Sequence, residues 1–182
     1  MRCSRMSPNE ICPDCQLWQK KFAGDDPLAA NHSIFVYNET MQQIIAKWKY
    51  RGDYILGNAF KTTFRKGFQQ YFGKWKNPIV IPIPLSEERL EERGFNQAQM
   101  LAEFLPAKIS DSLSRTAGEK QSKKNRKQRL SAQNPFRVDR PINKAVILVD
   151  DIYTTGTTLR HAASVLKENG CPKVAAYTLI RG

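Results

Sequence analysis

The chain has 182 residues and a formal net charge of +12, from 29 basic and 17 acidic side chains. That length fits one domain with a small appendage, and 41% apolar residues are enough to bury a core. No apolar run reaches the ~18 residues of a membrane span, and no secretory signal is visible, so we expect a cytoplasmic protein. The charge excess favours phosphorylated ligands, nucleic acid or an anionic membrane face as partners.

Residues 1–32 are predicted to form a small separate module. Cys12 and Cys15 have the spacing of a zinc half-site, in which two thiolates share one tetrahedral ion at ~2.3 Å. Cys3 is a candidate third ligand, and His32, water or another chain is a candidate fourth. A turn with two free thiols is the alternative. We favour zinc, because so short a polar segment needs a metal ion or another cross-link to fold.

Two amphipathic helices are predicted next, because apolar residues recur at helical spacing. The first helix carries Met41, Ile44, Ile45 and Trp48. The second carries Phe60, Phe64, Phe68 and Phe72. Basic residues between these phenylalanines leave base stacking open, but regular spacing is more typical of a core. The basic residues at the end of the first helix are expected to lie on its solvated face, and a contact with a ligand is the alternative. These residues are Lys47, Lys49 and Arg51.

A short strand is predicted at residues 79–83, where alternating prolines fix an extended backbone and end the pairing. The charged segment after it carries Arg89 and Arg93 among four glutamates. Either guanidinium suits a bidentate contact with a diphosphate, and surface ion pairs are the alternative. Asn96 and Gln99 fit a capping box that opens a further helix, so the role of Asn96 is structural in that interpretation.

Residues 106–140 show no firm periodicity and are expected to form a basic, mobile loop. Positions 120–129 hold six basic residues and no acidic one, and their repulsion favours an extended segment. Such a segment suits closure over a substrate or contact with single-stranded DNA, and a solvated linker is the alternative. The candidate nucleic-acid ligands are Lys123, Lys124, Arg126, Lys127 and Arg129.

The end of the chain is predicted to be a β-α-β unit. Residues 145–149 are an apolar run typical of a strand buried on both faces, residues 159–166 have helical spacing, and residues 174–180 form a second strand. Asp150 and Asp151 end the first run. A loop of hydroxyls around one glycine follows, made of Thr154, Thr155, Gly156, Thr157 and Thr158.

This loop suits a phosphate monoester, because glycine permits a tight turn while hydroxyls, backbone N–H groups and the helix dipole attract an anion. Asp150 and Asp151 suit the hydroxyls of a ribose, held directly or through Mg²⁺. A ribose 5-phosphate is therefore the expected ligand. The chain has neither the G-x-x-x-x-G-K-[ST] motif of P-loop ATPases nor the G-x-G-x-x-G motif of dinucleotide sites. A strand capped by a polar turn is the plain alternative.

Residues 149–158 resemble the phosphoribosyl-pyrophosphate signature of type I phosphoribosyltransferases. Three further segments are similar to one branch of that superfamily, the ComF family of bacterial late competence proteins: Cys12–Cys15, Ile81–Ser86 and Arg93–Ala98. The resemblance covers nearly the whole chain. It implies an α/β fold, a doubly wound parallel sheet of the type I phosphoribosyltransferase kind at residues 33–182, with a zinc-ribbon-like module at residues 1–32.

The resemblance also implies ligands and their contacts. Phosphoribosyl pyrophosphate would bind with Mg²⁺, and its pyrophosphate would lie against Pro84, Leu85, Ser86 and Arg93. Zinc would bind Cys3, Cys12 and Cys15. Members of the family have an earlier C-x-x-C pair, in which Cys3 would be the second cysteine and the first would precede Met1. We therefore expect the sequence to begin downstream of a true start.

Three functions remain open at this point. The resemblance implies a protein that supports single-stranded DNA uptake in natural transformation. Its partners would be single-stranded DNA and other competence proteins, such as a DNA helicase or translocase, at the inner face of the membrane. The alternatives are a metabolic enzyme that transfers ribose 5-phosphate to a nucleobase or an amine, and a zinc-bearing nucleic-acid adaptor without catalysis. No general base is recognisable, so the sequence names no catalytic residue and no acceptor.

Overall fold

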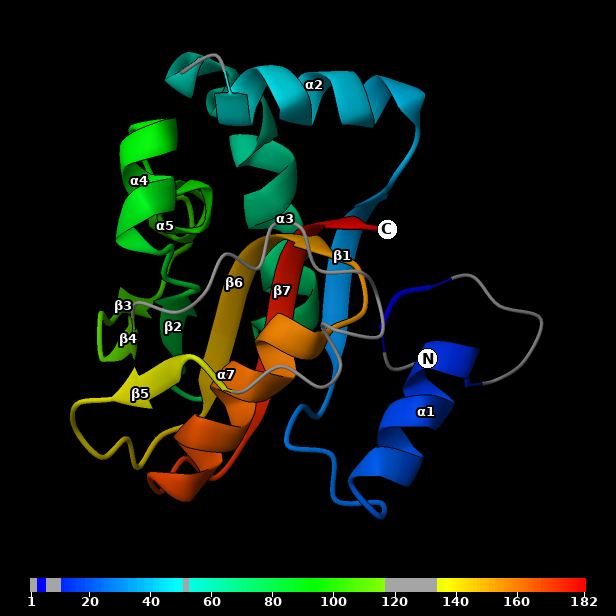
Figure 1. Ribbon diagram of the computed structural model, residues 1–182, viewed down its shortest axis with the longest axis vertical. Helices are drawn as coiled ribbons and strands as arrows, with labels where there is room; N and C mark the ends of the chain where they lie inside the picture. Colours follow the sequence, from blue (N-terminus) through cyan, green and yellow to red (C-terminus); the bar gives the residue numbers. More distant parts are fainter. Residues whose placement is uncertain (1–2, 6–10, 51–52, 117–133) are drawn as a thin grey trace.

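The computed structural model describes residues 3–5, 11–50, 53–116 and 134–182 (Figure 1). A five-stranded parallel sheet in the order β1-β7-β6-β2-β3 forms its centre. These strands are β1 (Asn31–Val36), β2 (Ile79–Pro82), β3 (Lys108–Ile109), β6 (Val146–Tyr153) and β7 (Val174–Arg181). A separate antiparallel pair consists of β4 (Leu113–Arg115) and β5 (Phe136–Val138).

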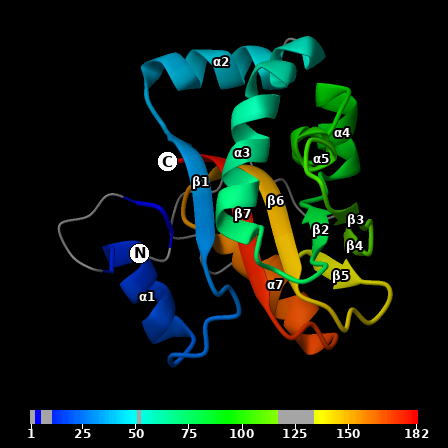
Figure 2. The ribbon, with the colours of Figure 1, turned by 180° about the vertical axis from the view of Figure 1, so that it is seen from behind.

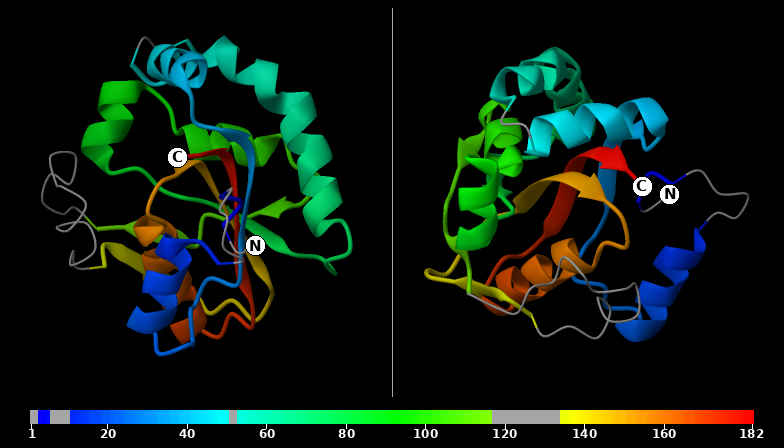
Figure 3. Two further views of the ribbon diagram at one scale, coloured as in Figure 1. Left: turned by 90° about the vertical axis from the view of Figure 1, so that its right-hand side faces the viewer. Right: turned by 45° about the horizontal axis from the view of Figure 1, so that its top comes forward.

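Helices cover both faces of the sheet, as Figures 1 and 2 show from opposite sides. One face carries α3 (Lys61–Phe72) and α5 (Gln97–Glu103), and the other carries α7 (Thr157–Glu168) and the N-terminal α1 (Pro13–Lys21). The helices α2 (Glu39–Tyr50) and α4 (Glu87–Arg93) lie past the carboxyl ends of the strands, and the 3₁₀ helix η1 (Tyr54–Phe60) leads into α3 (Figure 3). The predicted doubly wound α/β fold is confirmed.

The side chains of β6 show why its sequence is continuously apolar. Ile147 and Val149 pack with the α3 side of the core, whereas Val146 and Leu148 pack with the α7 side. Successive side chains of a strand point to opposite faces, so a strand covered on both faces needs apolar residues throughout. The four phenylalanines of η1 and α3 are all buried in the same core, so the core interpretation of their spacing is confirmed.

Three predicted boundaries differ from the structure. β6 continues through both aspartates to Tyr153, because its backbone stays paired with β7 as far as Arg181. β1 begins at Asn31, so the edge strand of the sheet starts inside the range 1–32. Residues 106–140 contain β3, β4 and β5, so the ends of that segment are ordered strands rather than loop.

The predicted capping box at the start of α5 is half correct. The Asn96 side chain accepts a hydrogen bond from Ala98 N at 3.0 Å and therefore caps the helix. Its amide nitrogen donates to the Ile83 carbonyl at 3.0 Å, which ties the cap to the segment after β2. Gln99 does not return a bond to Asn96, because its amide donates to the Glu103 carboxylate instead, at 2.9 Å.

The order of the strands places a crevice at the carboxyl end of β2 and β6. The chain leaves β2 toward β3 and leaves β6 toward β7, so the two connections diverge between these neighbouring strands. Open α/β sheets bind ligands at such a topological switch point. Among the described residues, no helix is long and apolar enough to cross a bilayer.

Candidate functional site

A cavity of about 270 Å³ lies at this switch point. Ten residues singled out from the sequence line it: Pro84, Leu85, Arg89, Arg93, Asp150, Asp151, Thr154, Thr155, Thr157 and Thr158. Ser86 and Gly156 are not in the lining; Ser86 precedes α4, and Gly156 precedes α7. The fold thus brings together the segment after β2, the end of β6 and the start of α7.

The threonine loop, residues 153–157, turns sharply from β6 into α7. Gly156 has a φ of +77°, in the left-handed region that favours glycine. A Cβ at this position would overlap the Tyr153 hydroxyl and the Arg160 guanidinium, so glycine is required by space as well as by conformation. The hydroxyls of Thr155 and Thr157 are 2.9 Å apart and belong to one hydrogen-bonded group. The loop therefore presents hydroxyls to the cavity from a fixed backbone.

The two aspartates at the end of β6 have different electrostatic surroundings. Asp151 pairs with Lys49, and their side chains are only 11% and 13% exposed. Burial disfavours the Asp151 charge, but Lys49 overrides it and keeps the pKa of Asp151 below its ordinary value. Burial, followed by the charge of Asp151, raises the pKa of Asp150 to about 7. Near neutral pH, Asp150 therefore ionises readily when a cation or a polar ligand arrives.

Positive charge surrounds the rest of the cavity. Arg89, Arg93 and Arg115 line it together with Lys49. Arg93 donates to the Gln97 side chain at 3.0 Å, which ties its guanidinium to the first turn of α5. Burial, with the nearby charge of Arg89, lowers the pKa of Arg115. Such a concentration of guanidinium groups attracts a polyanion.

Several lining residues were not selected as site residues from the sequence. Lys49 was expected on a solvated face, and that interpretation is wrong, because its ammonium group pairs with Asp151 at the end of β6. Arg115 and Phe136 come from β4 and β5, inside the segment expected to be a loop, and His161 is on α7. The position of His161, one turn into the helix after the threonine loop, was the only sequence signal for it.

The candidate nucleic-acid ligands Lys123, Lys124, Arg126, Lys127 and Arg129 lie outside the described residues.

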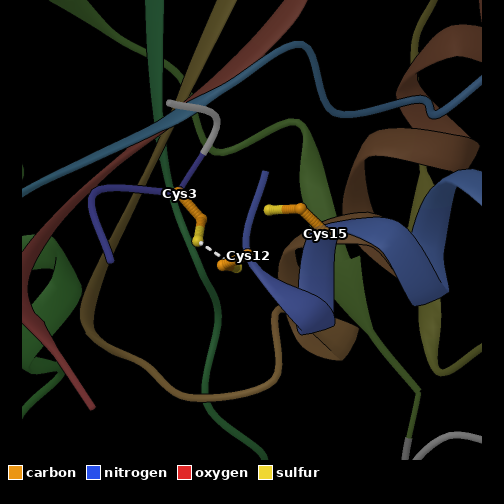
Figure 4. Close-up of side chains that lie close together, drawn as sticks. All are labelled: Cys3, Cys12 and Cys15. Carbon is orange, nitrogen blue, oxygen red and sulfur yellow. Dashed lines mark hydrogen bonds between the residues drawn. The ribbon is translucent and has the colours of Figure 1, made fainter. Parts of the chain in front are cut away.

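Three cysteines of the N-terminal segment form a second cluster of chemically reactive groups (Figure 4). Their sulfur atoms all lie within 4.8 Å of one another, and Cys3 Sγ is 3.4 Å from Cys12 Sγ. All three side chains are buried. Hydrogen bonding to Cys15 lowers the pKa of Cys3 to about 5, and hydrogen bonding to Cys3, with burial, raises the pKa of Cys15. A metal ion stabilises all three thiolates together, so this donor set fits one.

His32 is not part of this cluster. Its ring stacks on Tyr71 with the centroids 4.1 Å apart and meets Phe72 edge-on at 5.6 Å, on the α3 face of the sheet. The cysteines pack with the α7 face. The prediction of His32 as a candidate fourth ligand is therefore wrong, and the described residues supply three ligands.

Comparison with known proteins places the chain in a family. The family model of the phosphoribosyl transferase domain matches residues 57–182. Over 185 residues the chain is 42% identical to competence protein ComFC of Bacillus subtilis (strain 168), covering 98% of this chain and 76% of that protein. The chain belongs to the ComFC family of competence proteins. A second ComFC relative, from Streptococcus pneumoniae (strain ATCC BAA-255 / R6), is 33% identical over 98% of this chain and 79% of its own length.

The ComFC family membership confirms the resemblance found in the sequence, including its phosphoribosyltransferase-like domain. A more distant relative is the DNA utilization protein YhgH of Escherichia coli (strain K12), which is 31% identical over 112 residues. That match covers 56% of this chain and 48% of YhgH. The relatives of this chain thus include both competence proteins and a protein named for the use of DNA.

Proposed function

We propose that this ComFC family member binds phosphoribosyl pyrophosphate with Mg²⁺ in the cavity between the ends of β2 and β6. The supporting observation is that three kinds of groups meet around one cavity of about 270 Å³. The threonine loop suits the 5′-phosphate, Asp150 and Asp151 suit the ribose hydroxyls, and Pro84 with Leu85 and Arg93 suit the pyrophosphate. No single group would select this ligand, but the three kinds of groups together match its 5′-phosphate, its ribose and its pyrophosphate.

Mg²⁺ fits the aspartate pair, because it prefers one or two carboxylates together with ligand oxygens. When bound, it neutralises charge on the pyrophosphate. Asp150 and Asp151 would hold it, and Lys49 sets the charge of Asp151 before the ion arrives. Arg93 and Arg89 would contact the pyrophosphate from α4. The cavity thus binds and orients an activated sugar through electrostatics.

We further propose that the three cysteines hold zinc and that the protein supports the uptake of single-stranded DNA. The zinc proposal rests on three buried thiols within 4.8 Å of one another. The DNA proposal rests on the two ComFC relatives, which are named as competence proteins, and on the charge of +12. The basic segment at 120–129 is the proposed contact. Neutralising Lys123, Lys124, Arg126 and Lys127 should flatten the log–log salt slope of single-strand binding by about 3.

Calorimetric titration with phosphoribosyl pyrophosphate, with and without Mg²⁺, tests the ligand proposal. The wild-type protein should bind with Mg²⁺, and the double variant Asp150→Asn, Asp151→Asn should lose the binding. Equal binding by that variant would remove the proposal. Pyrophosphate release on addition of a nucleobase or an amine would instead indicate a metabolic transferase. Binding without release under these conditions favours a role in which the sugar is a bound ligand or a regulator.

A further inference from the structure

The N-terminal module, residues 3–5 and 11–30, contacts the backbone of the threonine loop. The Trp18 indole Nε1 donates a hydrogen bond to the Thr155 carbonyl at 2.7 Å, although 137 positions separate the two residues. Trp18 is 1% exposed and does not line the cavity. The Arg160 guanidinium lies 4.7 Å from the centroid of its ring. Trp18 is therefore held in one place and aims its only donor at the loop.

Arg181, at the end of β7, holds the two preceding carbonyls of the loop. Its Nη1 donates to the Tyr153 carbonyl at 3.2 Å and to the Thr154 carbonyl at 3.0 Å. Its Nη2 donates to the Asp14 carboxylate at 3.4 Å and lies 3.8 Å from Cys3 Sγ. The module thus orients Arg181 through Asp14, and Arg181 is only 3% exposed.

Three consecutive carbonyls, at residues 153, 154 and 155, are consequently tied to Arg181 and Trp18. The described residues contain no cis peptide bond, and in a trans peptide the carbonyl of one residue and the N–H of the next point in opposite directions. The N–H groups of Thr154, Thr155 and Gly156 therefore point away from Trp18 and Arg181. A loop that binds an anion needs its N–H groups aimed in this coordinated way.

A second set of contacts supports the loop through its side chains. Asp26 of the module accepts from Arg160 at 3.1 Å from Nε and 2.8 Å from Nη2. Arg160 in turn donates from Nη1 to the Tyr153 hydroxyl at 2.7 Å. These are the groups that leave no room for a side chain at Gly156. The module therefore holds the threonine loop from its backbone and from its side chains.

We propose that the N-terminal module is part of the phosphate site, and that Trp18 and Arg181 are positioning residues for it. They orient the N–H groups of the threonine loop, so the affinity for a sugar 5-phosphate depends on a module that does not touch the ligand. This inference rests on the proposed function in one respect, namely that the loop binds the 5′-phosphate. It adds a role for the module beyond metal binding.

Two probes, ribose 5-phosphate and inorganic pyrophosphate, separate the loop from the rest of the cavity. Each is titrated by calorimetry with Mg²⁺ into the full chain. Trp18→Phe deletes the donor but keeps an aromatic ring over Arg160, and Trp75→Phe is the matched control, since Trp75 packs on Phe72 and Lys173 far from the loop. Trp18→Phe should weaken the binding of ribose 5-phosphate about threefold to tenfold, which is the effect of one hydrogen bond. It should leave the affinity for pyrophosphate unchanged.

The outcomes distinguish this inference from the proposed function. If the wild-type protein binds pyrophosphate but not ribose 5-phosphate, the proposed function of the loop fails. If the wild-type protein binds both and Trp18→Phe binds both equally well, the positioning role is overturned while the phosphate site stands. An equal loss of both ligands would also overturn it, because general destabilisation does not discriminate between them.

A measurement on the wild-type protein covers the case in which Trp18→Phe fails to fold. The chain has three tryptophans, so its ¹H–¹⁵N spectrum contains three indole N–H signals. Trp75→Phe and Trp48→Phe each remove one of them, so the third signal is that of Trp18. The signal of Trp18 should shift when ribose 5-phosphate is added and stay in place when pyrophosphate is added. The absence of a shift at saturating ribose 5-phosphate would contradict the coupling.

Discussion

The aspartate pair and the cysteine cluster gather groups of like charge in buried surroundings, but they balance that charge differently. Asp151 has Lys49 as a counter-charge, and Asp150 has a raised pKa of about 7, so it keeps its proton below that pH. The cysteine cluster contacts Arg181 only at 3.8 Å, and its thiols shift the pKa values of one another in opposite directions. The first arrangement is stable without an ion and can exchange ligands, whereas the second requires an ion for three thiolates to coexist.

Removing the metal should therefore produce the largest effect. Cys12→Ser, or exhaustive chelation, should reduce bound zinc from about one per chain to well below that and lower the melting temperature by roughly 10 °C or more. The physical reason is that binding energy at a structural zinc site is also folding energy. Metal analysis and thermal unfolding measure the two quantities.

Cys171→Ser is the matched control for this experiment. Cys171 is buried like the others but donates to the carbonyls of Lys144 and Lys173 at the opposite end of α7, away from the cluster. The Cys171→Ser variant should keep its zinc. Full zinc in Cys12→Ser, or equal loss of zinc in the two variants, would show that the cluster is not the metal site.

Removing the protein's own counter-charge should have an intermediate effect. Lys49→Met leaves Asp151 buried without its cation, and breaking a buried pair costs about 3–5 kcal/mol, less here because both groups keep some exposure. A fall of about 5–10 °C in melting temperature is expected. Mg²⁺ should restore more stability to this variant than to the wild type, because the ion replaces the missing charge.

Lys47→Met serves as its control, since Lys47 is exposed on the same helix. It should change neither the melting temperature nor the response to Mg²⁺. If Lys49→Met behaved like Lys47→Met, the ion pair with Asp151 would have no energetic role, and the contrast with the cysteine cluster would lose its basis.

Residues that belong to a local pattern or to a motif of the resembled family were predictable, and residues brought to the site by the topology alone were not. The run from Val146 to Leu166 revealed a strand, an anion-binding loop and a helix, because each has a local pattern. Lys49 and Trp18 reach the same strand and loop from elsewhere in the chain. Only the positions of α2 past the ends of the strands and of α1 on the α7 side of the sheet decide this. His32 shows the same limit within one strand, because neighbouring side chains of β1 point to opposite faces.

A substitution of Asp150 should have the smallest effect on stability, and it tests the contrast between the aspartate pair and the cysteine cluster directly. Its folded pKa of about 7 lies above the ordinary 3.8, so the folded state keeps its proton between about pH 4 and 7 while the unfolded chain loses it. The contribution of Asp150 to stability is therefore lost as the pH rises through that window.

At pH 8, Asp150→Asn should stabilise the ligand-free protein by about 1–2 kcal/mol and so raise its melting temperature by a few degrees, and at pH 4 it should change little. Thermal unfolding of both proteins across this range measures the difference, and a variant less stable than the wild type at pH 8 would show that Asp150 is not held under electrostatic stress. Stabilisation by Asp150→Asn together with loss of ligand binding is the pattern expected of a site kept for binding, whereas every substitution in the cysteine cluster should only destabilise.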